Sequence, residues 1–253
     1  MYRILGTSFV CLLMLVALSS SPALAYDSPQ KYGVEFRGGF GLYDMGDVTT
    51  GMEAMQAAIN SNRDRAIPNK YDKTDTGPMG GISFLFRPSR HTMWEVGFNS
   101  LMDVENKLET TPDTSEQILM HANEFFMKGT LVATLSDRIH LDFGAGFSYY
   151  NAELQIQHAY GPTFVYDAVG RSWGLLGTVG LEFLLTERLG LLLQGGGRLT
   201  NVTHFNYESN SVYQELNYFN STRPMEVNLT GGFASLGLRV YFDKVTKPVD
   251  FTR

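Results

Sequence analysis

Two groups of residues carry side chains that could do chemistry. His140 and Asp142 lie two positions apart, and Glu182 follows later in the chain, so the three could be drawn as ligands of a metal ion. His204 and Ser209 supply a base and a hydroxyl, the pair that a nucleophilic hydrolase needs. A polar network inside the fold accounts better for the first group, and a surface loop accounts better for the second. We therefore predict no metal, no cofactor and no catalytic residues.

A third group consists of isolated charged residues that recur on one side of alternating segments. It contains five acids and four bases: Glu35, Arg37, Glu95, Glu124, Lys128, Asp142, Glu182, Arg198 and Arg239. Charges inside a protein are costly unless they are paired. A nearly balanced set therefore suits the interior of a narrow barrel filled by its own side chains.

The elements that must position these charges are β-strands. Between Ile139 and Tyr149, large apolar residues occupy every second position, with polar residues or glycine between them. This period of two indicates a strand rather than a helix. The pattern predicts eight strands, at about 32–43, 78–87, 92–103, 121–135, 139–149, 172–185, 189–203 and 227–242. In the last strand, Val227 to Phe233 are out of phase with the end, which predicts a β-bulge at 233–235.

The predicted connections alternate between short turns and long loops. The turns are 88–91, 136–137 and 186–188, and the loops are about 44–76, 105–119, 153–170 and 205–225. Outer-membrane barrels show this asymmetry, with short periplasmic turns and long extracellular loops. Ten strands would result if 154–169 formed a hairpin inside the membrane, but we expect this hairpin to extend above it.

The first long loop contains a predicted helix. Thr50 to Glu53 fits a capping box. Apolar residues recur at helical spacing at Val48, Met52, Met55 and Ile59. We expect the apolar side of this helix to pack on the barrel rim, with a lid, a plug or a partner-binding helix as the alternative.

Composition and the N-terminus indicate an exported, folded protein. The 253 residues are 43% hydrophobic and 18% charged, with a formal charge of −6, which argues against a nucleic-acid-binding protein. Arg3, an apolar segment at 9–18 and Ala23-Leu24-Ala25 form the pattern of a cleavable signal peptide. The predicted organisation is a signal peptide at 1–25, a barrel at 26–242 and a periplasmic tail at 243–253. The single cysteine, Cys11, lies inside the signal peptide, so disulfide bonds and cysteine zinc sites are excluded.

Aromatic residues gather near both ends of the predicted strands, as in the two interfacial belts of membrane proteins. The alternative is a soluble, lipocalin-like barrel with the apolar rows facing inward. Glycines among the isolated charges favour the membrane barrel. The belt residues are Tyr32, Phe86, Trp94, Tyr241 and Phe242 at the turn end and Tyr43, Tyr149, Tyr150, Trp173 and Tyr207 at the loop end.

The segment Gly237-Leu238-Arg239-Val240-Tyr241-Phe242 has a glycine followed by alternating hydrophobic residues that end in phenylalanine. With its eight strands, the chain resembles the OmpA/OmpX-like superfamily of small outer-membrane β-barrels of Gram-negative bacteria. In that family a similar terminal segment is the signal for the barrel-assembly machinery, which implies this role for Gly237, Val240 and Phe242. The chain departs from the family because polar residues follow the phenylalanine.

The resemblance implies an integral outer-membrane protein with a structural or surface-interaction role. Its expected partners are outer-membrane lipid and lipopolysaccharide, the assembly machinery and an unidentified extracellular ligand. One alternative is a narrow channel or carrier for small or hydrophobic solutes, as in OmpW-like relatives, because glycines among the charges could leave a path. Another is a lipid A-modifying enzyme. The deacylases of that kind have an H-x-S-N pattern, which His204-Phe205-Asn206 with Ser209 does not match.

Overall fold

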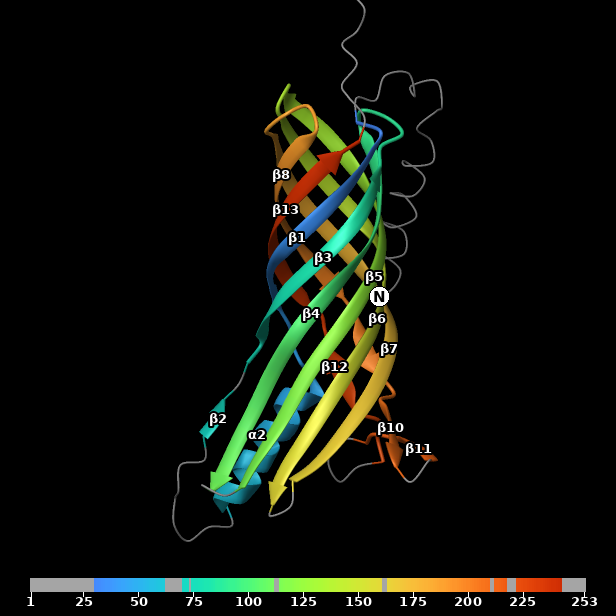
Figure 1. The fold of residues 1–253 in the computed structure, drawn as a ribbon. Coiled ribbons are helices and arrows are strands. Elements are labelled where there is room, and N and C mark those ends of the chain that lie inside the picture. Colours follow the sequence, from blue (N-terminus) through green and yellow to red (C-terminus); the bar gives the residue numbers. More distant parts are fainter. Residues whose placement is uncertain are drawn as a thin grey trace, which may run out of the picture.

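The computed structural model describes residues 30–61, 70–72, 74–111, 114–160, 163–209, 212–217 and 222–242. The predicted signal peptide and the predicted tail lie outside these residues. Eight antiparallel strands form a barrel (Figure 1), and β8 pairs with both β7 and β13, which closes it. The predicted all-β, eight-stranded antiparallel up-and-down barrel is confirmed. In order around the wall, the strands are β1 (Tyr32–Leu42), β3 (Thr76–Phe86), β4 (Thr92–Thr111), β5 (Thr114–Ser136), β6 (Ile139–Tyr160), β7 (Thr163–Leu184), β8 (Leu189–Leu199) and β13 (Gly231–Tyr241).

Four of the strands are much longer than the sequence predicts. β4 to β7 contain 20 to 23 residues each and run well beyond the ends of β1, β3 and β8 (Figure 1). The expected loop at 105–119 is therefore wrong, because this segment continues as the paired strands β4 and β5. At 153–170 the expected hairpin above the membrane is present, formed by direct continuations of β6 and β7. Above the barrel wall, the outward positions become polar while inward positions such as Ile118 and Leu154 are apolar and buried. Because of this reversal, the extended parts of β4 to β7 lack the apolar outward row by which the other strands were predicted.

The predicted bulge at 233–235 is also wrong. β13 pairs with β8 in continuous register from Gly231 to Val240. Val227, Leu229 and Phe233 are buried, as is Arg239, and all four lie on the inward row. The apparent change of phase is a change in what fills the interior, from charged side chains to apolar ones. The ladder is instead interrupted at 229–230, between β12 (Glu226–Asn228) and β13.

The remaining elements gather at the loop end of the barrel. The predicted helix exists as α2 (Asp47–Ser61), but it begins three residues before Thr50, so the capping box is wrong. No helix in the described part of the chain is long and apolar enough to cross a bilayer. Short strands extend the sheet formed by β4 to β7 on both sides or pair with each other: β2 (Lys70–Asp72), β9 (Asn201–Thr203), β10 (Asn206–Ser209) and β11 (Val212–Glu215).

Candidate functional site

The outer wall of the barrel is apolar. Large side chains that point away from the lumen are widely exposed: Phe40 by 68%, Phe125 by 53%, Leu193 by 54% and Trp173 by 73%. Water-soluble proteins do not expose apolar area on this scale outside interaction sites. The wall therefore faces lipid, and the lipocalin-like alternative, with its apolar rows inside, is wrong.

Aromatic residues flank this wall at both ends. At the turn end, the rings of Tyr32 and Phe86 stack with centroids 5.4 Å apart, and at the loop end Tyr149 and Trp173 make an edge contact at 5.1 Å. Three residues expected in these belts point inward instead. Tyr43, Tyr150 and Tyr241 are buried, because they lie on the same alternating rows as the lumen charges.

All nine predicted lumen charges lie inside the barrel, none of them exposed by more than 7%. Arg239 contacts the largest number of carboxylates among them. Its guanidinium group lies 2.8 Å from Glu35, 2.6 Å from Asp142 and 3.3 Å from Glu182. Glu182 also accepts hydrogen bonds from Tyr241 at 2.5 Å and from His140 at 3.2 Å. This arrangement is a polar network, and no group that could hold a metal ion occurs in the described residues.

A second group of charges continues the network across the lumen. Arg37 contacts Glu35 at 3.0 Å and forms an ion pair with Glu95. Lys128 contacts the other oxygen of Glu95 at 3.0 Å. The Arg37 guanidinium also donates to Ser83 at 2.8 Å. These contacts satisfy charges that would otherwise be costly to bury.

Glu124 and Arg198 form a looser pair above that network, 4.0 Å apart. Glu124 accepts hydrogen bonds from Asn99 at 2.8 Å and from Tyr150 at 2.5 Å. The Arg198 guanidinium lies over the ring of Phe233, 5.0 Å from its centroid, so this layer joins the charges to the apolar part of the interior. Asn99 shares its inward row with Glu95, and Tyr150, which was expected in the loop-end belt, shares its inward row with Asp142.

The inward glycines lie in close contact with their neighbours. A Cβ on Gly146 would lie 2.1 Å from the carbonyl oxygen of Met127, and one on Gly39 would lie 2.1 Å from that of Ala234. A Cβ on Gly144 would lie 2.4 Å from the Thr178 hydroxyl. These glycines let neighbouring strands and long charged side chains approach one another, so the space they create is already occupied.

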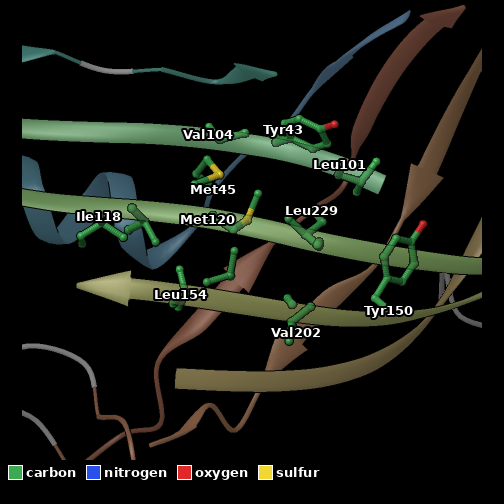
Figure 2. Packing of buried hydrophobic residues seen from close by; sticks show 14 of the residues in the cluster. Tyr43, Met45, Leu101, Val104, Ile118, Met120, Tyr150, Leu154, Val202 and Leu229 are labelled. Carbon is green, nitrogen blue, oxygen red and sulfur yellow. The ribbon is translucent and has the colours of Figure 1, made fainter. Parts of the chain in front are cut away.

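Above the charges, the interior is filled by an apolar cluster (Figure 2). Its members from the extended strands include Leu101, Val104, Ile118, Met120, Tyr150 and Leu154. Val202 of β9, Leu229 after β12 and Phe233 of β13 belong to the same cluster. Helix α2 and the segment before it contribute Tyr43, Met45, Val48 and Met52, all buried. The expected contact with the rim is therefore deeper than predicted, because the first turn of α2 sits in this cluster.

The start of α2 is fastened to the segment around β12. Asp47 accepts hydrogen bonds from Arg223 at 2.8 Å and from the backbone N–H of Glu226 at 2.9 Å. Asp44 accepts one from Asn228 at 2.8 Å. These three contacts bridge segments far apart in the sequence, and they hold the helix over the loop end of the lumen.

The turn end of the lumen is closed by a smaller apolar cluster of Leu85, Met93, Val132 and Tyr241. Beside it, Gln30 reaches across the opening and donates to the carbonyl oxygen of Glu187 at 3.0 Å. Arg87 donates to Gln30 at 3.4 Å. In the described residues, apolar clusters therefore lie at both ends of the lumen, with ion pairs between them.

The hydrolase pattern does not assemble. His204 forms an ion pair with Glu215, and its backbone carbonyl accepts a hydrogen bond from Asn206 at 3.2 Å. Ser209 lies at the far end of β10, opposite Val212. In the described part of the chain, His204 has no hydroxyl partner to activate.

The residues of the expected assembly signal lie in β13 and directly after it. Gly237 faces inward, where a Cβ would lie 3.2 Å from a Glu35 carboxylate oxygen. Phe242 is 52% exposed on the outer wall, and its backbone N–H donates to Tyr32 at 2.9 Å. Their role in assembly stays a prediction.

No protein-family model and no curated protein match the sequence. Among solved structures, the chain is similar to Neisserial surface protein A at a TM-score of 0.40 with 14% identity, covering 85% of this chain and 98% of that one. It is also similar to the outer membrane protein OprG of Pseudomonas aeruginosa at 0.46 with 10% identity, covering 85% and 97%. A third similarity, to the outer membrane protease OmpT of Escherichia coli, has a TM-score of 0.40 with 10% identity, covering 88% and 100%.

Likenesses of this strength say nothing about activity, and a fold does not define a function. The architecture follows from the chain itself, through its closed ring of strands, apolar wall and charged interior. By these features, the chain is an eight-stranded antiparallel membrane β-barrel.

Proposed function

We propose that the protein is an integral outer-membrane barrel that does not conduct and acts through its loop end. The observation that carries this proposal is the filled lumen. Paired charges occupy its middle, and apolar clusters close both ends. With no free path inside, the surface left for function is the part that the extended strands carry beyond the membrane.

The loop end is built as a packed head rather than as separate loops. The sheet formed by β4 to β7 carries β2 on one side and β10 on the other, and its inner face packs on α2. We propose that this head lies outside the cell and binds an extracellular ligand, while the barrel wall contacts outer-membrane lipid and lipopolysaccharide. Export by a cleavable signal peptide and insertion by the barrel-assembly machinery belong to the same proposal.

The two alternatives have less support. A channel for small solutes needs continuous space, and the inward glycines Gly39, Gly144 and Gly146 are closely packed against their neighbours. A lipid A-modifying enzyme needs a nucleophile beside its base, and His204 faces Glu215 instead. A non-enzymatic role is therefore part of the proposal.

Heat modifiability on SDS gels and conductance in planar bilayers test the proposal together. We expect the unboiled protein to migrate faster than the boiled protein, and the folded protein to add no conductance to a bilayer in which a wide porin gives clear steps. Regular conductance steps that change when Glu124 is replaced by alanine would support the channel instead. An unshifted band together with recovery in the soluble fraction would refute membrane residence. Lipid A mass spectra from cells with and without the protein should be identical.

A further inference from the structure

The turn end of the barrel carries a ring of exposed basic side chains. Each of the three tight turns contributes one exposed arginine: Arg90 between β3 and β4, Arg138 between β5 and β6, and Arg188 between β7 and β8. Lys31, just before β1, provides the fourth cation, and its Nζ lies 5.6 Å from the centroid of the Tyr32 ring. Because the hairpins follow one another around the barrel, the four charges are spread around its whole circumference.

These cations lie where an apolar wall meets the polar region of a membrane. Leu135 and Leu185, three residues before Arg138 and Arg188, are exposed by 61% and 54% on the outer wall. Within the described residues, the guanidinium groups of Arg138 and Arg188 make no ion pair or hydrogen bond. Among the described residues, the exposed acids at this end are Asp137 and Glu187, so the exposed basic groups outnumber the exposed acidic ones.

On the described outward face of β4 to β7, at the opposite end, the balance is reversed. Just beyond the aromatic belt there, the outward face of β4 to β7 carries the exposed acids Asp103, Glu105, Glu153 and Asp167, with Arg171 as its exposed base. A common preference of barrels for basic residues on every rim would not produce this difference. The basic ring therefore belongs to the particular surroundings of the turn end.

We propose that the basic ring binds the phosphate groups of anionic phospholipids in the leaflet next to the tight turns. The inference rests on the proposed membrane residence and adds a lipid class and a leaflet to it. A guanidinium group beside an exposed leucine suits a lipid because the acyl chain lies on the wall while the headgroup reaches the charge. A basic group near an anionic surface favours an anionic lipid by about fivefold at low salt, and the preference falls as salt rises.

The two tryptophans of the chain lie at opposite ends of the barrel, so a protein that retains one of them reports the lipid contacts of that end. Trp94 lies near the start of β4, opposite Phe86 at the turn end, and Trp173 lies in the belt at the loop end. Full-length protein with Trp173→Phe is inserted into phosphatidylcholine vesicles that contain a minor fraction of bromine-labelled lipid. The label is carried either by phosphatidylglycerol or by phosphatidylcholine. We expect several-fold stronger quenching of Trp94 by the anionic label, and this excess should shrink in high salt.

Two sets of variants separate the ring from other causes. The triple variant Arg90→Gln, Arg138→Gln and Arg188→Gln should remove the excess quenching of Trp94, whereas Arg171→Gln at the other end should leave it intact. The proposal would be overturned if both labelled lipids quenched Trp94 equally in the protein with its basic ring intact. It would also be overturned if the stronger quenching by the anionic label persisted in the triple variant. Absence of quenching by either label would instead show that the barrel has not inserted, which refutes membrane residence.

Discussion

Replacing Arg239 with methionine tests whether the ion pairs hold the barrel together. Methionine keeps much of the length and the apolar stem of arginine but removes the charge. The change leaves Glu35 and Asp142 without the cation that lies 2.8 and 2.6 Å from them, and Glu182 without its contact at 3.3 Å. All three carboxylates are buried, so water cannot take the place of the guanidinium group.

The expected loss follows from these contacts. Removing one partner of a buried ion pair destabilises a protein by about 3–5 kcal/mol, because the other charge stays buried and uncompensated. Glu35 retains Arg37 at 3.0 Å and Glu182 retains His140, which limits the damage to that range. Exposed Arg171, changed to methionine as the control, should alter the free energy of unfolding by no more than about 0.5 kcal/mol.

Urea unfolding of the refolded barrels, followed by the gel-mobility shift, measures the difference. A free energy of unfolding within about 1 kcal/mol of the native value for Arg239→Met would refute the reasoning, since the pairs would then contribute nothing net. Adding Glu35→Gln and Asp142→Asn to that variant should recover part of the loss, because these changes remove the stranded charges. A further loss would mean that packing, rather than charge, explains the effect.

Three other changes have distinct expected results. Gly146→Val should yield no heat-modifiable band, because its Cβ would lie 2.1 Å from a backbone oxygen, whereas Gly38→Val, which meets nothing within 4 Å, should fold normally. Asp47→Ala should cost about 1 kcal/mol locally and speed hydrogen exchange in α2, without moving the barrel's unfolding midpoint. Met52→Ala, at a fully buried position, should loosen α2 more strongly, by about 2–5 kcal/mol, and increase its proteolysis.

Much of the fold could be predicted from the sequence because alternate residues of a membrane-barrel strand face lipid and the lumen, and the two rows therefore differ in polarity. In Ile139 to Tyr149 the lipid-facing row is large and apolar and the other row is polar or glycine, so strand, face and burial follow together. The prediction stopped working where the strands leave the membrane. Beyond Phe125 on β5, the outward row becomes mostly polar, with Asn123, His121 and Gln117 beside Leu119. The inward row becomes Ala122, Met120 and Ile118, so the expected contrast reverses.

The candidate site was predictable in its membership but not in its pairing. Each predicted charge could be placed on an inward row from the two-residue alternation of side chains along its strand. Which acid meets which base depends on the stagger between strands, which the sequence pattern does not contain. Arg239 pairs with Glu35 on the neighbouring strand but also with Asp142 on β6, across the lumen. Parity alone could have added Asn99 and Tyr150, because both share a row with predicted charges.

The buried charges also explain how one register is selected in a barrel with a nearly uniform outer wall. A slip of one residue between β1 and its neighbours would move Glu35 and Arg37 from the lumen into lipid and bring Phe36 inward. An arginine or lysine near the middle of a bilayer costs about 2–4 kcal/mol. Because Arg37, Lys128, Arg198 and Arg239 lie on four different strands, such a slip of β1, β5, β8 or β13 exposes one of these cations to lipid and breaks its pair. A purely apolar interior would pack the lumen as well but would impose no such penalty, so the charges contribute to specificity even if their net stability is small.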